Sequence, residues 1–126
     1  MEQKDILEVA AMYPIAFKQM DINLIDAHFT EKATKTGFIY DYENDKWLDV
    51  STVQIPAIKE WAATFNKEGI MPDTETKMSI LDAQDRTAVV KLEMEWLVDK
   101  KGCDYIILIK EDNQWKIETI IYQSLL

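Results

Sequence analysis

The chain has little of the chemistry that most metal and thiol sites need. Among its 126 residues, Cys103 is the only cysteine and His28 the only histidine. One cysteine forms neither an internal disulfide nor a CxxC pair, and one histidine leaves no second imidazole for a zinc site. We therefore expect no metal and no cofactor. An unpaired cysteine also fits a reducing compartment such as the cytoplasm.

Long apolar runs are missing as well. No stretch approaches the roughly 18 apolar residues of a bilayer-spanning helix. Residues 1–5 are polar and lead directly into an amphipathic stretch, without the apolar segment of a secretory signal. With 23 acidic and 14 basic residues, the formal net charge at pH 7 is −9. Such a surface repels phosphate backbones and anionic lipids, so we expect no nucleic acid, no membrane and a cytoplasmic location.

The remaining composition is that of a globular protein. Hydrophobic residues make up 48% of the chain and charged residues 29%, which excludes disordered and low-complexity classes. The length suits one domain and is too short for two. Residues 1–126 are therefore predicted to form a single domain.

Helical periodicity dominates the first third of the chain. Apolar residues recur there at spacings of three and four: Ile6, Ala10, Tyr13, Phe17 and Met20. Pro14 lies inside this pattern and predicts a kink or a split of the helix. Asp21 is placed to cap a short second helix. Ser51 and Gln54 have the spacing of a capping box, which predicts a third helix that stops at Gly69.

Strand patterns fill the rest of the chain. Residues 33–50 alternate as in a strand or irregular hairpin, and four further strands are expected at residues 74–83, 87–99, 103–110 and 114–125. The loops between the last four are short, which favours antiparallel neighbours. Helices followed by a strand meander indicate an α+β domain, with the helices covering one face of a curved antiparallel sheet.

The last two strands are apolar on both faces. Tyr105, Ile107 and Ile109 share one face of the first of them, and Ile106 and Leu108 fill the other. Because the helices can cover only one face, we predict a homodimer that packs sheet to sheet through the outer face. The residues assigned to that interface are Ile106, Leu108, Ile117 and Ile121.

A family resemblance is carried by the carboxy-terminal run. Residues 105–118 comprise an apolar strand, a polar turn and Trp115-Lys116-Ile117, and Ile121-Tyr122 follow in the next strand. In this the chain resembles the nuclear transport factor two-like superfamily and is most similar to its putative lumazine-binding family. The superfamily also includes ketosteroid isomerases and polyketide cyclases. The resemblance implies a cystatin-like, cone-shaped antiparallel sheet wrapped around amino-terminal helices, with a small-molecule pocket inside.

Aromatic side chains are the candidates for lining this pocket around a small apolar or aromatic ligand. The predicted ligand-binding residues are Tyr13, Phe17, Phe38, Tyr40, Trp61, Phe65, Met94, Trp96, Tyr105, Ile107 and Tyr122. The same residue types could equally fill the cone as solid core. A small-molecule-binding protein is our main functional prediction.

An enzyme is the first alternative, and the sequence leaves open whether the protein catalyses a reaction. Tyr13, eight residues before Asp21, resembles the helical tyrosine of the isomerase branch, which implies an oxyanion donor. Aligned by eye, the catalytic base of that branch falls on Gly37 and its protonated aspartate near Ile107, so both carboxylates are predicted to be absent. An isomerase, dehydratase or cyclase would need another proton carrier, for which the candidates are Asp41, Glu118 and His28.

A protein-interaction adaptor is the second alternative, because the transport-factor branch of the superfamily uses the same fold in this way. An adaptor is expected to have a filled cone and an exposed apolar patch beyond its dimer face.

Overall fold

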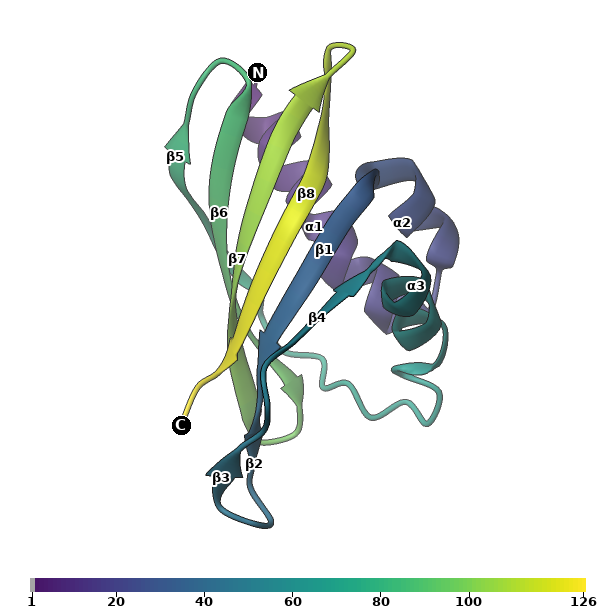
Figure 1. The fold of residues 1–126 in the computed structure, drawn as a ribbon, viewed down its shortest axis with the longest axis vertical. Coiled ribbons are helices and arrows are strands. Elements are labelled where there is room, and N and C mark those ends of the chain that lie inside the picture. Colours follow the sequence, from purple (N-terminus) through teal and green to yellow (C-terminus); the bar gives the residue numbers. More distant parts are fainter. Residues whose placement is uncertain (1) are drawn as a thin grey trace.

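Three helices cover one face of a curved six-stranded sheet in the computed structural model, which describes residues 2–126 (Figure 1). The helices are α1 (Glu2–Gln19), α2 (Ile22–His28) and α3 (Ile55–Thr64). The strands are β1 (Phe29–Phe38), β2 (Tyr40–Asp41), β3 (Lys46–Trp47), β4 (Ser51–Gln54), β5 (Lys77–Ala83), β6 (Thr87–Leu97), β7 (Lys100–Glu111) and β8 (Gln114–Ser124). The predicted α+β architecture is confirmed.

The sheet has the order β4-β1-β8-β7-β6-β5, and β2 and β3 form a separate hairpin. The strands β5 to β8 are joined by short loops and pair antiparallel, as expected. After the hairpin the chain returns to the sheet as β4, which pairs antiparallel with β1, and on its other side β1 runs parallel to β8. The helices lie on one face of the sheet and the short loops at the ends of its strands, so the second sheet face is left open (Figure 1).

The first helix forms as its apolar stripe predicts. Ile6, Ala10, Tyr13 and Phe17 are all buried against the sheet. The predicted split at Pro14 is wrong, since α1 is continuous through that residue. Proline removes one backbone donor, but buried residues on both sides of it hold the helix against the sheet.

The starts of the other two helices give one confirmed and one wrong prediction. Asp21 caps α2, since its carboxylate accepts a hydrogen bond of 3.1 Å from the backbone N–H of Asn23. Ser51 belongs to β4 and pairs with Gly37, so it is not a helix cap. α3 begins after Gln54, which makes no side-chain capping bond, and a proline in its first turn supplies a helical φ angle.

The two faces of β7 are opposite to the prediction. The register pairs Ile106 with Val90 and Leu108 with Ala88, and all four side chains are buried under the helices. Tyr105 and the residues alternating with it therefore lie on the outer face. Both faces of β7 are apolar, so alternation alone left the inward face undecided, and only the pairing with the amphipathic β6 fixes it.

A bulge in β8 determines which way the remaining predicted interface residues, Ile117 and Ile121, face. Ile107 pairs with Thr119 but Leu108 pairs with Ile117, so Glu118 is an extra residue in the strand. The bulge lets Ile117 and Ile120 face the core together, although they are three residues apart. Of the four predicted interface residues, Ile106, Leu108 and Ile117 are core residues. Ile121 is 38% exposed and lies on the outer face.

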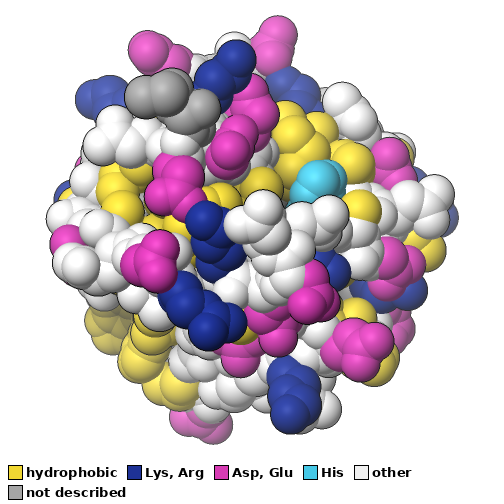
Figure 2. All heavy atoms as spheres, turned by 90° about the horizontal axis from the view of Figure 1, so that it is seen from above, with side chains coloured by type: hydrophobic (Ala, Val, Ile, Leu, Met, Phe, Trp, Pro, Cys, Tyr) yellow, Lys and Arg dark blue, Asp and Glu magenta, His cyan; other side chains and the backbone are white. Residues whose placement is uncertain are grey.

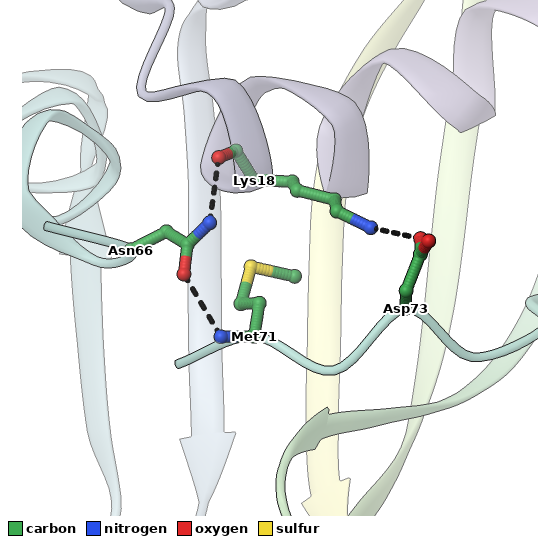
Figure 3. Close-up of polar contacts among 4 residues, drawn as sticks. All are labelled: Lys18, Asn66, Met71 and Asp73. Carbon is green, nitrogen blue, oxygen red and sulfur yellow. Dashed lines mark hydrogen bonds and ion pairs between the residues drawn. The ribbon is translucent and has the colours of Figure 1, made fainter. Parts of the chain in front are cut away.

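The connection from α3 to β5 is held to the end of α1 (Figure 3). The Asn66 amide donates to the backbone carbonyl of Lys18 at 2.9 Å and accepts from the backbone N–H of Met71 at 2.8 Å. The Lys18 ammonium pairs with Asp73 at 2.6 Å. These bonds fix residues 65–73 against the helix, with the Met71 side chain buried beneath them.

Charges of both signs share the end of the molecule seen from above in Figure 2, with an apolar area between them. The β2–β3 hairpin and the β6–β7 turn lie at the opposite end (Figure 1). Residues of this hairpin and of the last part of β6 belong to the wall of a cavity.

Candidate functional site

A cavity of about 500 Å³ lies between α3, the β2–β3 hairpin and the adjoining ends of β1, β6 and β8. This volume is in the range of small-molecule sites. Its wall is mainly apolar and aromatic and consists of Phe17, Lys35, Gly37, Ile39, Tyr40, Asp41, Tyr42, Glu43, Leu48, Ser51, Trp61, Phe65, Trp96, Leu97, Lys100, Tyr122 and Ser124. Six of these were candidates from the sequence: Phe17, Tyr40, Trp61, Phe65, Trp96 and Tyr122.

The other five candidates lie outside this wall. Tyr13 and Met94 are buried in the core. Phe38 is an exposed residue at the end of β1. Tyr105 and Ile107 lie on the outer face of β7, because that strand faces the opposite way to the prediction.

Lys35, Tyr13 and Asp104 form a hydrogen-bonded chain at the inner end of the cavity. The Lys35 ammonium donates to the Tyr13 hydroxyl oxygen at 2.6 Å, and this hydroxyl donates to Oδ2 of Asp104 at 2.7 Å. The indole N–H of Trp96 donates to the second carboxylate oxygen at 3.2 Å. The three members of the chain and Trp96 thus come from one helix and three strands. Only Lys35 and Trp96 of these four reach the cavity wall.

Aromatic rings surround the amine of Lys35. Its Nζ atom lies 4.8 Å from the ring centroid of Tyr13, 4.9 Å from that of Phe17, 5.5 Å from that of Trp96 and 5.6 Å from that of Tyr122. Ring faces at such distances attract a cation but supply no hydrogen-bond acceptor. The rings therefore replace water around the amine with apolar surface.

Burial changes the pKa of all three groups in the chain. It raises the pKa of Asp104 to about 6, although Lys35 and the bonds from Tyr13 and Trp96 act in the opposite direction. Burial likewise raises the pKa of Tyr13 well above its usual range, with Asp104 adding to the effect. The pKa of Lys35 is lowered by burial, and Asp104 partly offsets this. Desolvation thus favours the neutral form of every member.

Sequence reasoning missed Lys35 and Asp104. The alignment by eye placed the isomerase branch's second carboxylate near Ile107, three residues past Asp104, the acid that bonds to Tyr13. A signal existed, since Asp104 occupies an inward-facing position in line with Ile106 and Leu108, where a charged residue is unusual. Reading it required the correct inward face of β7.

Tyr13 does not present its proton to the cavity. The hydroxyl donates to Asp104, and its oxygen already accepts from Lys35. Of Lys35, Tyr13 and Asp104, Lys35 is therefore the residue that a ligand in the cavity would contact. The oxyanion-donor role that the isomerase resemblance implies for Tyr13 would require this arrangement to break.

The three candidate proton carriers are scattered. Asp41 lies at the cavity wall, where bonds from the Asn44 side chain and from the backbone of Asn44 and Glu43 lower its pKa and make it a weak base. Glu118 lies outside the wall and accepts a hydrogen bond of 2.6 Å from Thr30. His28, also outside the wall, has its pKa lowered by burial and by Lys116.

Two negative findings concern residues 2–126. No group of three or more His, Cys, Asp and Glu side chains in this range is arranged to hold a metal ion. No helix in the same range is long and apolar enough to cross a membrane.

Comparison with known proteins finds a match between residues 1–123 and the family model described as putative lumazine-binding. A nuclear transport factor two-like protein of unknown function from Shewanella baltica is 20% identical, with a TM-score of 0.73, and the match covers 99% of this chain and 94% of that one. A ketosteroid isomerase-like protein from Erwinia carotovora atroseptica is 14% identical, with a TM-score of 0.65, and the match covers 100% and 98%.

A domain of unknown function with a cystatin-like fold from Nostoc punctiforme is 13% identical, with a TM-score of 0.64. That match covers 98% of this chain and 77% of the other. A search of curated proteins found no match. At these identities the solved structures establish the fold, which is the nuclear transport factor two-like and cystatin-like fold expected from the sequence.

Proposed function

The chain belongs to the putative lumazine-binding family, and we propose from this premise that it binds a small, largely apolar aromatic molecule in its cavity. The observation that carries the proposal is an aromatic-walled cavity of about 500 Å³ that has Lys35, with its amine among the rings, as part of its wall. Apolar walls with few polar groups are typical of small-ligand sites. A planar ligand would pack between the rings and place an acceptor oxygen at Lys35.

The cavity favours this function over the two alternatives. An adaptor needs no open cone, whereas this one has room for a ligand. Of Asp41, Glu118 and His28, the candidate proton carriers of an isomerase-type enzyme, Asp41 alone lines the cavity, and it is a poor base because several hydrogen bonds stabilise its ionised form.

We test binding by isothermal titration calorimetry with three probes: lumazine, riboflavin and 2-naphthylmethanol. Trp61→Glu should abolish or strongly weaken the binding of any active probe, since Trp61 is 42% exposed and lines the cavity. Leu81→Glu is the control, because Leu81 is 54% exposed and is not part of the cavity wall. Absence of binding by all three probes, or equal losses in both variants, would contradict the proposed site.

We propose a homodimer through the outer sheet face as the second part of the function. The helices cover the inner face, and apolar side chains of neighbouring strands remain at least partly accessible on the outer one: Val89, Tyr105, Ile107, Ile109 and Ile121. A second copy of the same face would cover them. The lone Cys103 supports a cytoplasmic location, which stays a prediction.

A further inference from the structure

Lys35 forms part of the cavity wall, and its amine lies among aromatic rings. The amine lies within 5.6 Å of four ring centroids and has the Tyr13 hydroxyl as its hydrogen-bond partner. An ammonium has three N–H donors. Among residues 2–126, the hydrogen-bond acceptor that contacts these N–H donors is the Tyr13 hydroxyl oxygen. The amine thus keeps capacity to react or bond with a ligand in the cavity.

A proton acceptor for Lys35 lies two hydrogen bonds away. A proton leaving Lys35 can pass to the Tyr13 oxygen while the Tyr13 proton moves to Asp104. The transfer converts a buried ammonium and carboxylate into a neutral amine and a neutral acid. Burial favours this exchange, because it penalises both charges. The pKa directions of Lys35 and Asp104 agree with it.

Within residues 2–126, the titratable groups that interact with Lys35 come from one helix and two strands. Tyr13 comes from α1, Asp104 from β7 and Tyr122 from β8, while β6 contributes the uncharged Trp96. Asp104 alone among these is an acid strong enough to ionise near neutral pH. It stabilises the ammonium when ionised, and it removes that stabilisation when it takes up the proton.

We infer that Lys35 is a nucleophilic amine that forms a Schiff base with an aldehyde or ketone bound in the cavity. This inference rests on the proposed function, because the carbonyl compound must first bind there. Desolvated lysines in apolar pockets are the usual amines of such chemistry. The substrate class is an apolar or aromatic aldehyde or ketone that fits the aromatic wall.

The step balances without an oxidant or reductant. The neutral amine attacks the carbonyl carbon, so a C–N bond forms and a proton moves from nitrogen to the former carbonyl oxygen. The C–O bond of this carbinolamine then breaks. Asp104, through Tyr13, returns the proton it had taken to the carbinolamine nitrogen. The proton moves from there to the hydroxyl, which leaves as water. Overall, one ammonium and one carbonyl give one iminium and one water, with no change in charge.

The test is reductive trapping on the full chain. The protein is incubated with 2-naphthaldehyde and sodium cyanoborohydride at pH 7, and labelled lysines are located by intact mass and peptide mapping. Lys100 is the internal reference, because it lines the same cavity but is exposed. We expect Lys35 to be labelled severalfold faster than Lys100, because burial lowers the pKa of Lys35 and so raises the fraction of its amine that is neutral.

Variants separate chemistry from structure. Lys35→Arg keeps a cation but cannot form an imine, so the fast label should disappear, whereas Lys100→Arg should keep it. Tyr13→Phe breaks the proton path, so labelling of Lys35 should fall at pH 7 and recover at higher pH. The wild-type peptide map needs no variant, so it decides the proposal even where Lys35→Arg fails to fold.

Binding of 2-naphthylmethanol, measured by calorimetry, distinguishes the two proposals. If the alcohol binds and Lys35 is not labelled faster than Lys100, the Schiff-base inference is wrong and the binding function stands. If the alcohol binds and the Lys35 label dominates, both are supported. If neither the alcohol nor the aldehyde binds, the Schiff-base inference is overturned, and the proposed function falls with it when lumazine and riboflavin fail to bind as well.

Discussion

The Nζ atom of Lys35 lies 2.6 Å from the hydroxyl oxygen of Tyr13, although the two residues are 22 positions apart and belong to β1 and α1. The same hydroxyl donates a hydrogen bond to Asp104, which is 91 residues from Tyr13. Three residues of unlike chemistry thus act as one buried unit.

The first prediction concerns stability and pH. Asp104 has an ordinary pKa of 3.8 and a folded-state pKa of about 6, so the folded protein binds its proton more tightly than the unfolded chain. Its contribution favours folding at acidic pH and is lost as the pH rises from 3.8 to about 6. The full change is on the order of 3 kcal/mol.

The measurement is urea unfolding of the wild type and of Asp104→Asn across this pH range. The difference in unfolding free energy between them should move against the wild type by that amount as the pH rises. Parallel profiles would show that Asp104 titrates normally.

The second prediction concerns the coupling between Lys35 and Asp104. Lys35→Met leaves a buried carboxylate without its cation and should cost about 3 kcal/mol. Adding Asp104→Asn removes that carboxylate, so the double variant should be more stable than the sum of the two single effects by about 1–3 kcal/mol. Chemical denaturation of the four proteins measures this, and strict additivity would refute a direct coupling.

The third prediction concerns Gly102. A Cβ atom added there would lie 2.2 Å from Cε1 of Tyr122, so the ring can occupy its place on the cavity wall only while residue 102 has no side chain. Gly102→Ala should push the ring away and weaken probe binding severalfold, with a loss of about 1–3 kcal/mol in stability. In a Tyr122→Ala background the same change should have little effect on stability. A comparable loss there would locate the clash elsewhere.

The fourth prediction separates the two faces of the sheet. Ile121→Glu alters a side chain that is 38% exposed on the outer face, so it should leave the fold intact and convert the proposed dimer to a monomer. Ile106→Glu places a charge in a site with 0% exposure and should unfold the protein. Circular dichroism and light scattering after size exclusion report both. A folded Ile121→Glu variant of unchanged dimer mass would exclude this interface.

The fifth prediction concerns the connection between α3 and β5. Asn66→Ala removes the two hydrogen bonds that hold this segment to Lys18 and Met71, and should cost about 1–3 kcal/mol (Figure 3). Because Phe65 lines the cavity next to this position, probe affinity should fall as well. Thermal melting and calorimetry check the two effects, and an unchanged melting temperature would show that the bonds contribute nothing in solution.

The sequence predicted the elements better than their ends and faces. The α1 stripe and the Asp21 cap depend on neighbours within one or two turns, so periodicity was enough to find them. Gln54 was predicted to lie inside a helix but ends β4, because pairing of β4 with β1 outweighs a local capping pattern. The inward face of β7 could not be predicted, since both of its faces are apolar.

By itself the sequence determined the α+β class, the order of helices and strands, and a family membership that the carboxy-terminal strands carry. Six of the cavity's aromatic residues were also among the candidates, because large aromatic side chains in such a fold are buried either in the core or in the wall of a cavity. The tertiary structure decided the site. Lys35 and Asp104 are ordinary charged residues in their strands, and only the packing of α1 against β1 and β7 removes their water and joins them through Tyr13. Desolvation is a property of the assembled core, which no local pattern encodes.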